Sequence, residues 1–281
     1  MKILVTGGNG QLGRAFQQMQ AQTEHEIIAR DVDCLDITNQ AQVFAIMEKL
    51  RPDAVVHGAA YTQVDLAESR EDDAFRVNAV GTQNIAAACL EQNVKMVYVS
   101  TDYVFDGEKE TAYVETDVVC PQSAYGRTKL AGEELAARIC PRLFIARTAW
   151  LYGDGNNFVR TMRKLAAEKD ELSVVHDQTG TPTYAVDLAQ AILKLLPTAY
   201  YGTYHMTNSG QCTWYEFACE ILRQSGSATP VRPVTTAEFV RPAKRPRHSV
   251  LRNYMLEQTI GDPFRPWQEG LAEYLRLEAL R

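Results

Sequence analysis

A tyrosine and a lysine stand four residues apart in the stretch SAYGRTK, residues 123–129, where a polar loop gives way to a helical pattern. Residues i and i+4 share one face of a helix, so Tyr125 and Lys129 can face one cleft. A free tyrosine has a pKa of about 10, and a neighbouring cation lowers it by about 1–3 units, towards the range of a general acid. The pair indicates proton transfer; the alternative is a surface aromatic beside a solvated lysine.

A glycine-rich turn at the start of the chain indicates which kind of ligand would bind beside this pair. Residues 2–6 are predicted to form a buried strand, and glycines follow at positions 7, 10 and 13 before a helical stretch over 14–21. Gly7 allows the tight turn, Gly10 lets a pyrophosphate approach the backbone, and Gly13 lets the helix pack closely. The spacing is GxxGxxG rather than GxGxxG, and it predicts dinucleotide binding at the helix N-terminus.

The second predicted strand, residues 26–31, ends where such folds contact the adenosine ribose. An acid there suits a free 2′-hydroxyl and an arginine suits a 2′-phosphate. Both Arg30 and Asp31 are present, so the choice between NADH and NADPH stays open. Asp36 and Ile37 follow, where adenine is often held; they also fit the N-cap region of a helix over 40–50.

Further predicted strands end in residues suited to a ligand site. The strand over 54–60 ends in Ala59 and Ala60, whose small side chains let a cofactor come close, and the strand over 95–99 leads into Ser100 and Thr101. Asn78, in a helix predicted over 74–91, is either an ordinary polar residue or a point where the helix bends. Because strands alternate with helices, we expect an α/β Rossmann fold with a doubly wound parallel sheet.

The second half of the chain has a different character and predicts a smaller C-terminal α/β substrate-binding domain. We expect residues 1–150, with a returning segment at about 181–206, to bind NAD(P), and residues 151–180 and 207–281 to bind substrate. Five basic residues lie among prolines in residues 241–251. They form either a solvated loop or a rigid loop that offers arginines to a diphosphate.

Composition excludes several classes of protein. The chain has 281 residues, 46% hydrophobic and 23% charged, and no apolar run approaches the ~20 residues of a membrane span. A net charge of −6 argues against nucleic-acid binding. The six cysteines form no CxxC motif, the histidines show no metal-ligand spacing, and the strand-like start leaves no room for a signal peptide. We therefore expect a cytoplasmic protein without a membrane or nucleic-acid partner.

Three motifs, TGGNGQLG, STDYVFDG and YGRTKLAGE, resemble those of the extended short-chain dehydrogenase/reductases. More narrowly, GNNFVRTM, DQTGTPTY and RPRHSVL resemble the dTDP-4-dehydrorhamnose reductases within that family, and the resemblance covers nearly the whole chain. It implies a Rossmann domain, a cofactor that is NADPH or NADH, and a dTDP-sugar substrate. The implied reaction is reduction of dTDP-4-dehydro-L-rhamnose to dTDP-L-rhamnose, the final step of dTDP-rhamnose biosynthesis.

The resemblance also implies site residues. It makes Thr101, Tyr125 and Lys129 catalytic, with Tyr125 donating a proton to the C4 oxygen and Lys129 holding the nicotinamide ribose. With the residues identified above, the predicted cofactor contacts are Gly7, Gly10, Gln11, Leu12, Gly13, Arg30, Asp31, Asp36, Ile37, Ala59, Ala60, Tyr61, Thr62, Tyr125 and Lys129. The predicted substrate contacts are Thr101, Asp102, Tyr103, Trp150, Asn157, Gln178, Arg245 and Arg247. Trp150 could pack on the sugar or thymine, or be a buried aromatic between domains.

One departure from the family pattern concerns a metal. Some members bind magnesium at a dimer interface through glutamates, the first just after the glycine loop, where this chain has Arg14 and Ala15. We therefore predict no metal, while a homodimer stays open. Two alternatives remain for function: another nucleotide-sugar 4-ketoreductase or epimerase, and a non-catalytic NADP-binding regulatory subunit resembling that of methionine adenosyltransferase. The intact set of Thr101, Tyr125 and Lys129 favours the enzyme.

Overall fold

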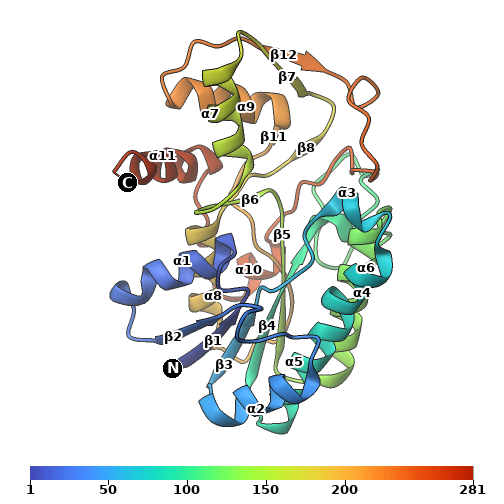
Figure 1. The fold of residues 1–281 in the computed structure, drawn as a ribbon, viewed down its shortest axis with the longest axis vertical. Helices are drawn as coiled ribbons and strands as arrows, with labels where there is room; N and C mark the ends of the chain where they lie inside the picture. Colours follow the sequence, from blue (N-terminus) through green and yellow to red (C-terminus); the bar gives the residue numbers. More distant parts are fainter. Residues whose placement is uncertain (281) are drawn as a thin grey trace.

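The computed structural model describes residues 1–280, and a six-stranded parallel sheet forms its centre (Figure 1). The strand order is β10-β5-β4-β3-β1-β2. The strands are β1 (Lys2–Thr6), β2 (Glu26–Arg30), β3 (Ala54–His57), β4 (Lys95–Thr101), β5 (Leu143–Thr148) and β10 (Gly202–His205). After β1 the chain adds β2 on one side and then β3 on the other, so the order reverses beside β1.

Helices cover both faces of the sheet. They are α1 (Gln11–Met19), α2 (Gln40–Leu50), α5 (Thr82–Glu91), α6 (Ala124–Ile139) and α8 (Ala185–Leu195). Successive side chains of a strand point to opposite faces. Accordingly Ile3 and Val5 pack with α1 and α8, while Leu4 packs with α2, α5 and α6. Apolar residues on both faces of β1 therefore specify a sheet that is buried on both sides.

Short helical turns connect these elements. They are η1 (Gln20–Gln22), α3 (Val64–Ala67), α4 (Glu71–Phe75), the π-helix η2 (Arg76–Gly81) and η3 (Asp102–Val104). The helix expected over 74–91 is thus interrupted by a π-turn before α5 begins. The strand expected over 54–60 ends at His57, and α1 begins at Gln11 rather than residue 14 because Gly10 is its N-cap.

A second group of elements forms what we call the C-terminal lobe, seen above the sheet in Figure 1. Its helices and main strands are α7 (Phe158–Glu168), β7 (Leu172–Val175), α9 (Trp214–Gln224), β12 (Val231–Val234) and α11 (Trp267–Glu278). Two short strand pairs join it to the sheet: β6 (Leu151–Tyr152) with β9 (Thr183–Tyr184), and β8 (Thr179–Gly180) with β11 (Cys212–Thr213). Its core is rich in aromatic side chains around Phe217.

Two later segments return to the sheet. Strand β10 pairs with β5, and α10 (Tyr254–Thr259) packs beside β10 with Leu256 in the core that contains α1 and α8. The predicted α/β Rossmann fold class is confirmed by this parallel sheet and its flanking helices. Within residues 1–280, no helix combines the length and apolarity needed to cross a lipid bilayer.

Candidate active site

A cavity of about 540 Å³ opens at the carboxyl ends of the strands, where the glycine loop, β4, α6 and segment 148–156 converge. In open α/β sheets, ligands bind at this edge, next to the point where the strand order reverses. That point lies between β1 and β3, and residues after both strands line the cavity. Its wall includes these predicted site residues: Gly7, Gly10, Gln11, Leu12, Gly13, Ala60, Thr62, Thr101, Asp102, Tyr103, Tyr125, Lys129 and Trp150.

The glycine loop has a backbone that leaves no room for side chains at two positions. Gly7 has a φ of +71°, and a Cβ there would lie 2.8 Å from the backbone nitrogen of Ala59. A Cβ on Gly13 would collide with the carbonyl oxygen of Gly7. Gly10 is the N-cap of α1, and no side chain within residues 1–280 caps that helix. Its first N–H groups are therefore suited to phosphate oxygens.

Tyr125 lies in the first turn of α6, which Ser123 caps through its side chain. One turn later, Lys129 is buried; its Nζ donates to the carbonyl oxygen of Val99 at 2.7 Å and lies 4.1 Å from the centre of the Tyr98 ring. Both Tyr125 and Lys129 line the cavity, as their spacing predicts. The helix thus brings the proton donor and the lysine to one wall.

The electrostatics of this pair differ from the expectation. Burial raises the pKa of Tyr125, the carboxylate of Asp102 adds to the rise, and hydrogen bonding with Thr101 opposes it. The expectation that this pKa falls below its usual value is wrong, because burial of the phenol outweighs the nearby Lys129, whose Nζ donates to Val99. Burial also lowers the pKa of Lys129 to about 7, so this amine gains and loses protons near neutral pH.

Thr101 links the tyrosine to a buried carboxylate. Its Oγ1 donates to Oδ1 of Asp102 at 2.9 Å and accepts from the backbone nitrogen of Tyr103 at 3.2 Å. Asp102 is 2% exposed, and burial raises its pKa to about 6 although hydrogen bonds from Ser249 and Thr101 oppose the rise. Asp102 and the backbone of Tyr103 thus fix the orientation of the Thr101 hydroxyl beside Tyr125.

The buried carboxylate makes stability depend on pH. Ionised Asp102 is disfavoured in the fold, because its pKa rises from 3.8 to about 6, so the native protein loses stability as the pH increases from 4 to 6. A difference of about two in pKa is equivalent to at most about 3 kcal/mol. Asp102→Asn should abolish this loss. The free energy of unfolding of the variant should therefore rise relative to that of the wild type between pH 4 and pH 7. Urea unfolding at both pH values measures it; a difference between the two proteins that does not change with pH would contradict the assignment.

Asn78 fixes the backbone beside the cavity. Its Oδ1 accepts from the nitrogen of Tyr61 at 2.8 Å, and its Nδ2 donates to the oxygen of Tyr61 at 3.2 Å and to Oγ1 of Thr128 at 3.0 Å. It lies in the π-turn η2, whose altered bonding leaves its carbonyl oxygen to accept from Oγ1 of Thr82 at 2.6 Å. The turn thereby joins the segment after β3 to α6.

A second cavity of about 500 Å³ lies in the C-terminal lobe, between α7, β7 and segment 239–245. Trp214 lines both cavities, and its ring stacks on that of Trp150 at 3.6 Å with an angle of 10° between the planes. Trp150 has a φ of +46°, a region that non-glycine residues seldom adopt, and it packs where Gly180 has no side chain. The two indoles form a partition at the junction of the cavities.

The other predicted substrate contacts are distributed unevenly. Gln178 and Arg245 line the second cavity, and the guanidinium of Arg245 forms a double hydrogen bond with Asp65. Asn157 is the N-cap of α7, and Arg247 is exposed. Within residues 1–280, neither of these two side chains belongs to a wall of the two cavities.

The predicted adenosine contacts lie at the end of β2 and beyond. Oδ2 of Asp31 accepts from the backbone nitrogen of Asn9 at 2.7 Å, which ties this strand end to the glycine loop. Arg30 donates to its neighbour's carbonyl oxygen, and Asp36 accepts from the backbone nitrogen and hydroxyl of Thr38. The cap of α2 is Asn39, while Ile37 packs beside Gly81. These residues lie outside the main cavity wall in the described chain.

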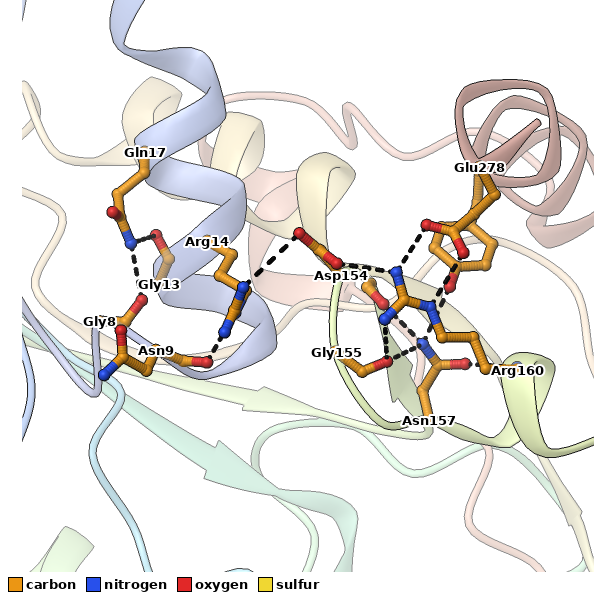
Figure 2. A network of polar contacts seen from close by, with 12 residues as sticks. Gly8, Asn9, Gly13, Arg14, Gln17, Asp154, Gly155, Asn157, Arg160 and Glu278 are labelled. Carbon is orange, nitrogen blue, oxygen red and sulfur yellow. Dashed lines mark hydrogen bonds and ion pairs between the residues drawn. The ribbon is translucent and has the colours of Figure 1, made fainter. Parts of the chain in front are cut away.

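Figure 2 shows Asp154 between Arg14 and Arg160. Arg14 of α1 lies 3.9 Å from this carboxylate, and Arg160 of α7 donates to it at 2.8 Å and to Glu278 at 2.8 and 2.9 Å. Because Asp154 also lines the main cavity, these contacts tie the start of α1 to the C-terminal lobe. Within residues 1–280, no three His, Cys, Asp or Glu side chains form a cluster that could hold a metal ion.

Three residues of this region were not found from the sequence. Trp214 and Asp65 lie far in the chain from the residues they contact around the cavities, and Asp154 contacts distant Arg14 as well as nearby Arg160. The only local signal is the capping box of Thr213 and Glu216, which marks the start of α9 and says nothing of what Trp214 packs against.

A parallel sheet with a glycine loop at the reversal of strand order, and a Thr–Tyr–Lys set in the adjoining cavity, define an NAD(P)-dependent oxidoreductase of the short-chain dehydrogenase/reductase class. Residues 1–279 match the family model described as the RmlD substrate binding domain, and the chain belongs to this family. This match confirms the narrower resemblance seen in the sequence motifs.

Known proteins resemble the chain over nearly its whole length. It is 42% identical to the spore coat polysaccharide biosynthesis protein SpsK of Bacillus subtilis, covering 98% of this chain and 97% of that one. A crystal structure of a dTDP-4-dehydrorhamnose reductase from Clostridium acetobutylicum is 52% identical, with a TM-score of 0.97 and coverages of 99% and 100%. The corresponding enzyme of Bacillus anthracis, solved in complex with NADP, is 42% identical, with a TM-score of 0.96 and coverages of 98% and 99%.

Proposed function

We propose that the protein reduces dTDP-4-dehydro-L-rhamnose to dTDP-L-rhamnose with NADPH or NADH, the final step of dTDP-rhamnose biosynthesis. One observation carries the proposal: Thr101, Tyr125 and Lys129 line the same cavity as the glycine loop. A non-catalytic nucleotide-binding subunit needs the loop but has no use for a proton donor beside it. The name of the Bacillus anthracis relative and its bound NADP support the same function.

The residues around the glycine loop fit a dinucleotide. The uncapped start of α1 would meet the pyrophosphate through backbone N–H groups, and Gly7 and Gly13 leave the space that this approach requires. On this proposal Arg30, Asp31, Asp36 and Ile37 surround the adenosine. The remaining contacts would be made by Gly10, Gln11, Leu12, Ala59, Ala60, Tyr61, Thr62, Tyr125 and Lys129. The bound nicotinamide supplies a hydride, and the chain's own groups handle the proton.

The proton transfer follows from the hydrogen bonds of the site. As negative charge develops on the C4 oxygen of the keto sugar, the Tyr125 hydroxyl donates its proton there. Thr101 lies within hydrogen-bonding reach of that phenol, and Asp102 fixes the orientation of the Thr101 hydroxyl. Lys129, with a pKa near 7, favours the phenolate that remains. On this proposal Lys129 also bonds the nicotinamide ribose.

The substrate would extend from the main cavity into the second one. We assign cofactor binding to residues 1–150 with the return at about 181–206, and substrate binding to residues 151–180 and 207–281. The proposed substrate contacts are Thr101, Asp102, Tyr103, Trp150, Asn157, Gln178, Arg245 and Arg247. An acidic diphosphate is complementary to the arginines near the second cavity. A cytoplasmic location and a homodimer remain predictions.

The proposal is tested with the purified chain, chemically prepared dTDP-4-dehydro-L-rhamnose and reduced cofactor. We expect consumption of NADPH or NADH with matching formation of dTDP-L-rhamnose, identified by mass and by comparison with an authentic standard. Parallel reactions with the 4-keto sugar of D-gluco configuration test the choice among 4-ketoreductases. Cofactor binding without turnover of either sugar would favour the regulatory subunit.

Cofactor preference depends on two side chains of opposite charge at the end of β2. Arg30 should attract a 2′-phosphate and Asp31 should repel it, so we expect NADH and NADPH to be used within about tenfold of each other, or roughly 1.4 kcal/mol. Arg30→Ala should shift the preference towards NADH, and Asp31→Ala towards NADPH. The ratio of kcat/KM for the two cofactors measures the shift in each variant. An unchanged ratio in both would place the choice elsewhere in the loop.

A further inference from the structure

Asp65 joins α3 to a segment that lies almost two hundred residues later in the chain. Arg245 donates from Nη1 to Oδ1 at 2.9 Å and from Nη2 to Oδ2 at 3.0 Å, and the backbone nitrogen of Ala243 donates to Oδ1 at 3.3 Å. Arg241 lies 3.9 Å from the same carboxylate. In Figure 1 the segment that follows β12 passes beside α3. One carboxylate thus gathers three groups of segment 241–245.

This contact lies close to the two cavities in which the substrate is proposed to bind. Val64, next to Asp65, lines the main cavity, while Arg241 and Arg245 line the second one. Hydrogen bonding from Arg245 holds the pKa of Asp65 below its usual range. The Asp65 side chain is 30% exposed and that of Arg245 is 23% exposed, so the pair is more sheltered than ordinary surface ion pairs. The contact therefore links the segment beside the main cavity to an arginine on the wall of the second cavity.

The geometry of the pair leaves Arg245 able to bind a second anion. Asp65 engages the end of the guanidinium formed by Nη1 and Nη2. A guanidinium carries five N–H donors; Asp65 takes two and the carbonyl oxygen of Ala243 accepts from Nη1, so the edge formed by Nε and the other Nη2 hydrogen is the one that can face a phosphate oxygen. Tyr103, whose ring meets that of Tyr125 edge-on at 5.6 Å, also hydrogen-bonds Arg245. The fixed arginine therefore lies between the reaction site and the second cavity.

We propose that Asp65 is a positioning residue, which holds Arg245 so that its guanidinium edge is presented to the diphosphate of the nucleotide sugar. The inference rests on the proposed function for the identity of the ligand. An arginine on a loop loses rotamer freedom when it binds an anion, and that cost reduces affinity. Asp65 reduces this loss of affinity, because its two hydrogen bonds already order the Arg245 side chain before the ligand binds. Asp65 acts on binding, and the proton transfer at Tyr125 does not depend on it.

The test compares Asp65→Asn with a matched ion-pair variant, Glu71→Gln. Glu71 of the neighbouring α4 forms a similar double hydrogen bond with Arg127 of α6, and neither residue lines either cavity. We expect Asp65→Asn to raise KM for the nucleotide sugar about tenfold, the effect of losing a charged hydrogen bond, with kcat within about twofold and NADPH affinity unchanged. Glu71→Gln should leave all three constants unchanged.

Calorimetric titration with dTDP separates this inference from the proposed reaction, because it needs no turnover. Binding of dTDP to wild type should weaken about tenfold in Asp65→Asn, recover in part in Asp65→Glu, and stay unchanged in Glu71→Gln. In an Arg245→Gln background, Asp65→Asn should add nothing, because both changes act through one contact. Unchanged or tighter dTDP binding by Asp65→Asn, or no binding by wild type, overturns the inference. If dTDP binding behaves as expected while no keto sugar is reduced, only the proposed reaction fails.

Discussion

Tyr125→Phe should reduce kcat by about 10²–10⁴, the usual cost of losing a general acid, while NADPH and dTDP bind nearly as they do to wild type. The phenyl ring keeps the packing against Tyr103, and the cavity wall keeps its shape. Only the hydroxyl that faces Thr101 is removed. Single-turnover reduction of the keto sugar, together with separate titrations of each ligand, measures the two effects.

Thr101→Val is the companion variant, because it removes the hydroxyl that bonds both Tyr125 and Asp102. We expect a smaller loss of kcat than in Tyr125→Phe, since the proton donor itself remains. If Tyr125→Phe turned over the keto sugar at the rate of wild type, the proton would have to come from another group.

Lys129→Met should impair both the chemistry and cofactor binding, in contrast to Tyr125→Phe. It removes the cation that favours the phenolate and the proposed donor to the nicotinamide ribose. We expect kcat to fall by about 10²–10⁴ and the NADPH dissociation constant to rise by about tenfold or more. Fluorescence titration with NADPH and single-turnover kinetics distinguish the two losses. Equal NADPH affinity in wild type and variant would show that the ribose contact is wrong.

Lys129→Met should lose activity but gain stability, so its loss of activity cannot be explained by unfolding. Burial lowers the pKa of Lys129 from 10.5 to about 7, so the protonated form is disfavoured in the fold. The native state therefore gains stability as the pH rises from 7 towards 10.5, and at pH 7 or below Lys129 is a cost to the fold. Methionine fills the same space without a charge. Lys129→Met should accordingly unfold at a higher urea concentration than wild type at pH 6.

Much of the fold was predictable because its signals are local. Continuous apolar strands such as residues 2–6 indicate a sheet buried on both faces, and glycines at 7, 10 and 13 mark a turn that only small residues allow. The same holds for Tyr125 and Lys129, whose spacing alone places them on one face of α6. In each case the determining interactions lie within a few residues along the chain.

The remaining features depend on contacts between distant segments. The π-turn at Asn78 exists because its side chain bonds Tyr61 and Thr128, which no helical pattern reveals. The direction of the Tyr125 pKa depends on how completely the phenol is enclosed, and the sequence indicates only the nearby lysine. The stack of Trp150 on Trp214 likewise brings together two residues from different elements. Such pairings require the three-dimensional arrangement.

Strand β10 lies well after its partner β5 in the sequence, and this order has a consequence for the newly made chain as it leaves the ribosome. Residues 143–148 of β5 are made well before their partner strand, and between residue 148 and residue 205 the ribosome must add β6, α7, β7 and α8. At roughly 5–20 residues per second, those 57 residues take about 3–11 s. During that time β5 presents an unpaired apolar edge, the kind of surface that other chains pair with and chaperones cover. Tyr125 and Lys129 are already synthesised by then, so the proposed catalytic residues exist before the parallel sheet beside them is complete.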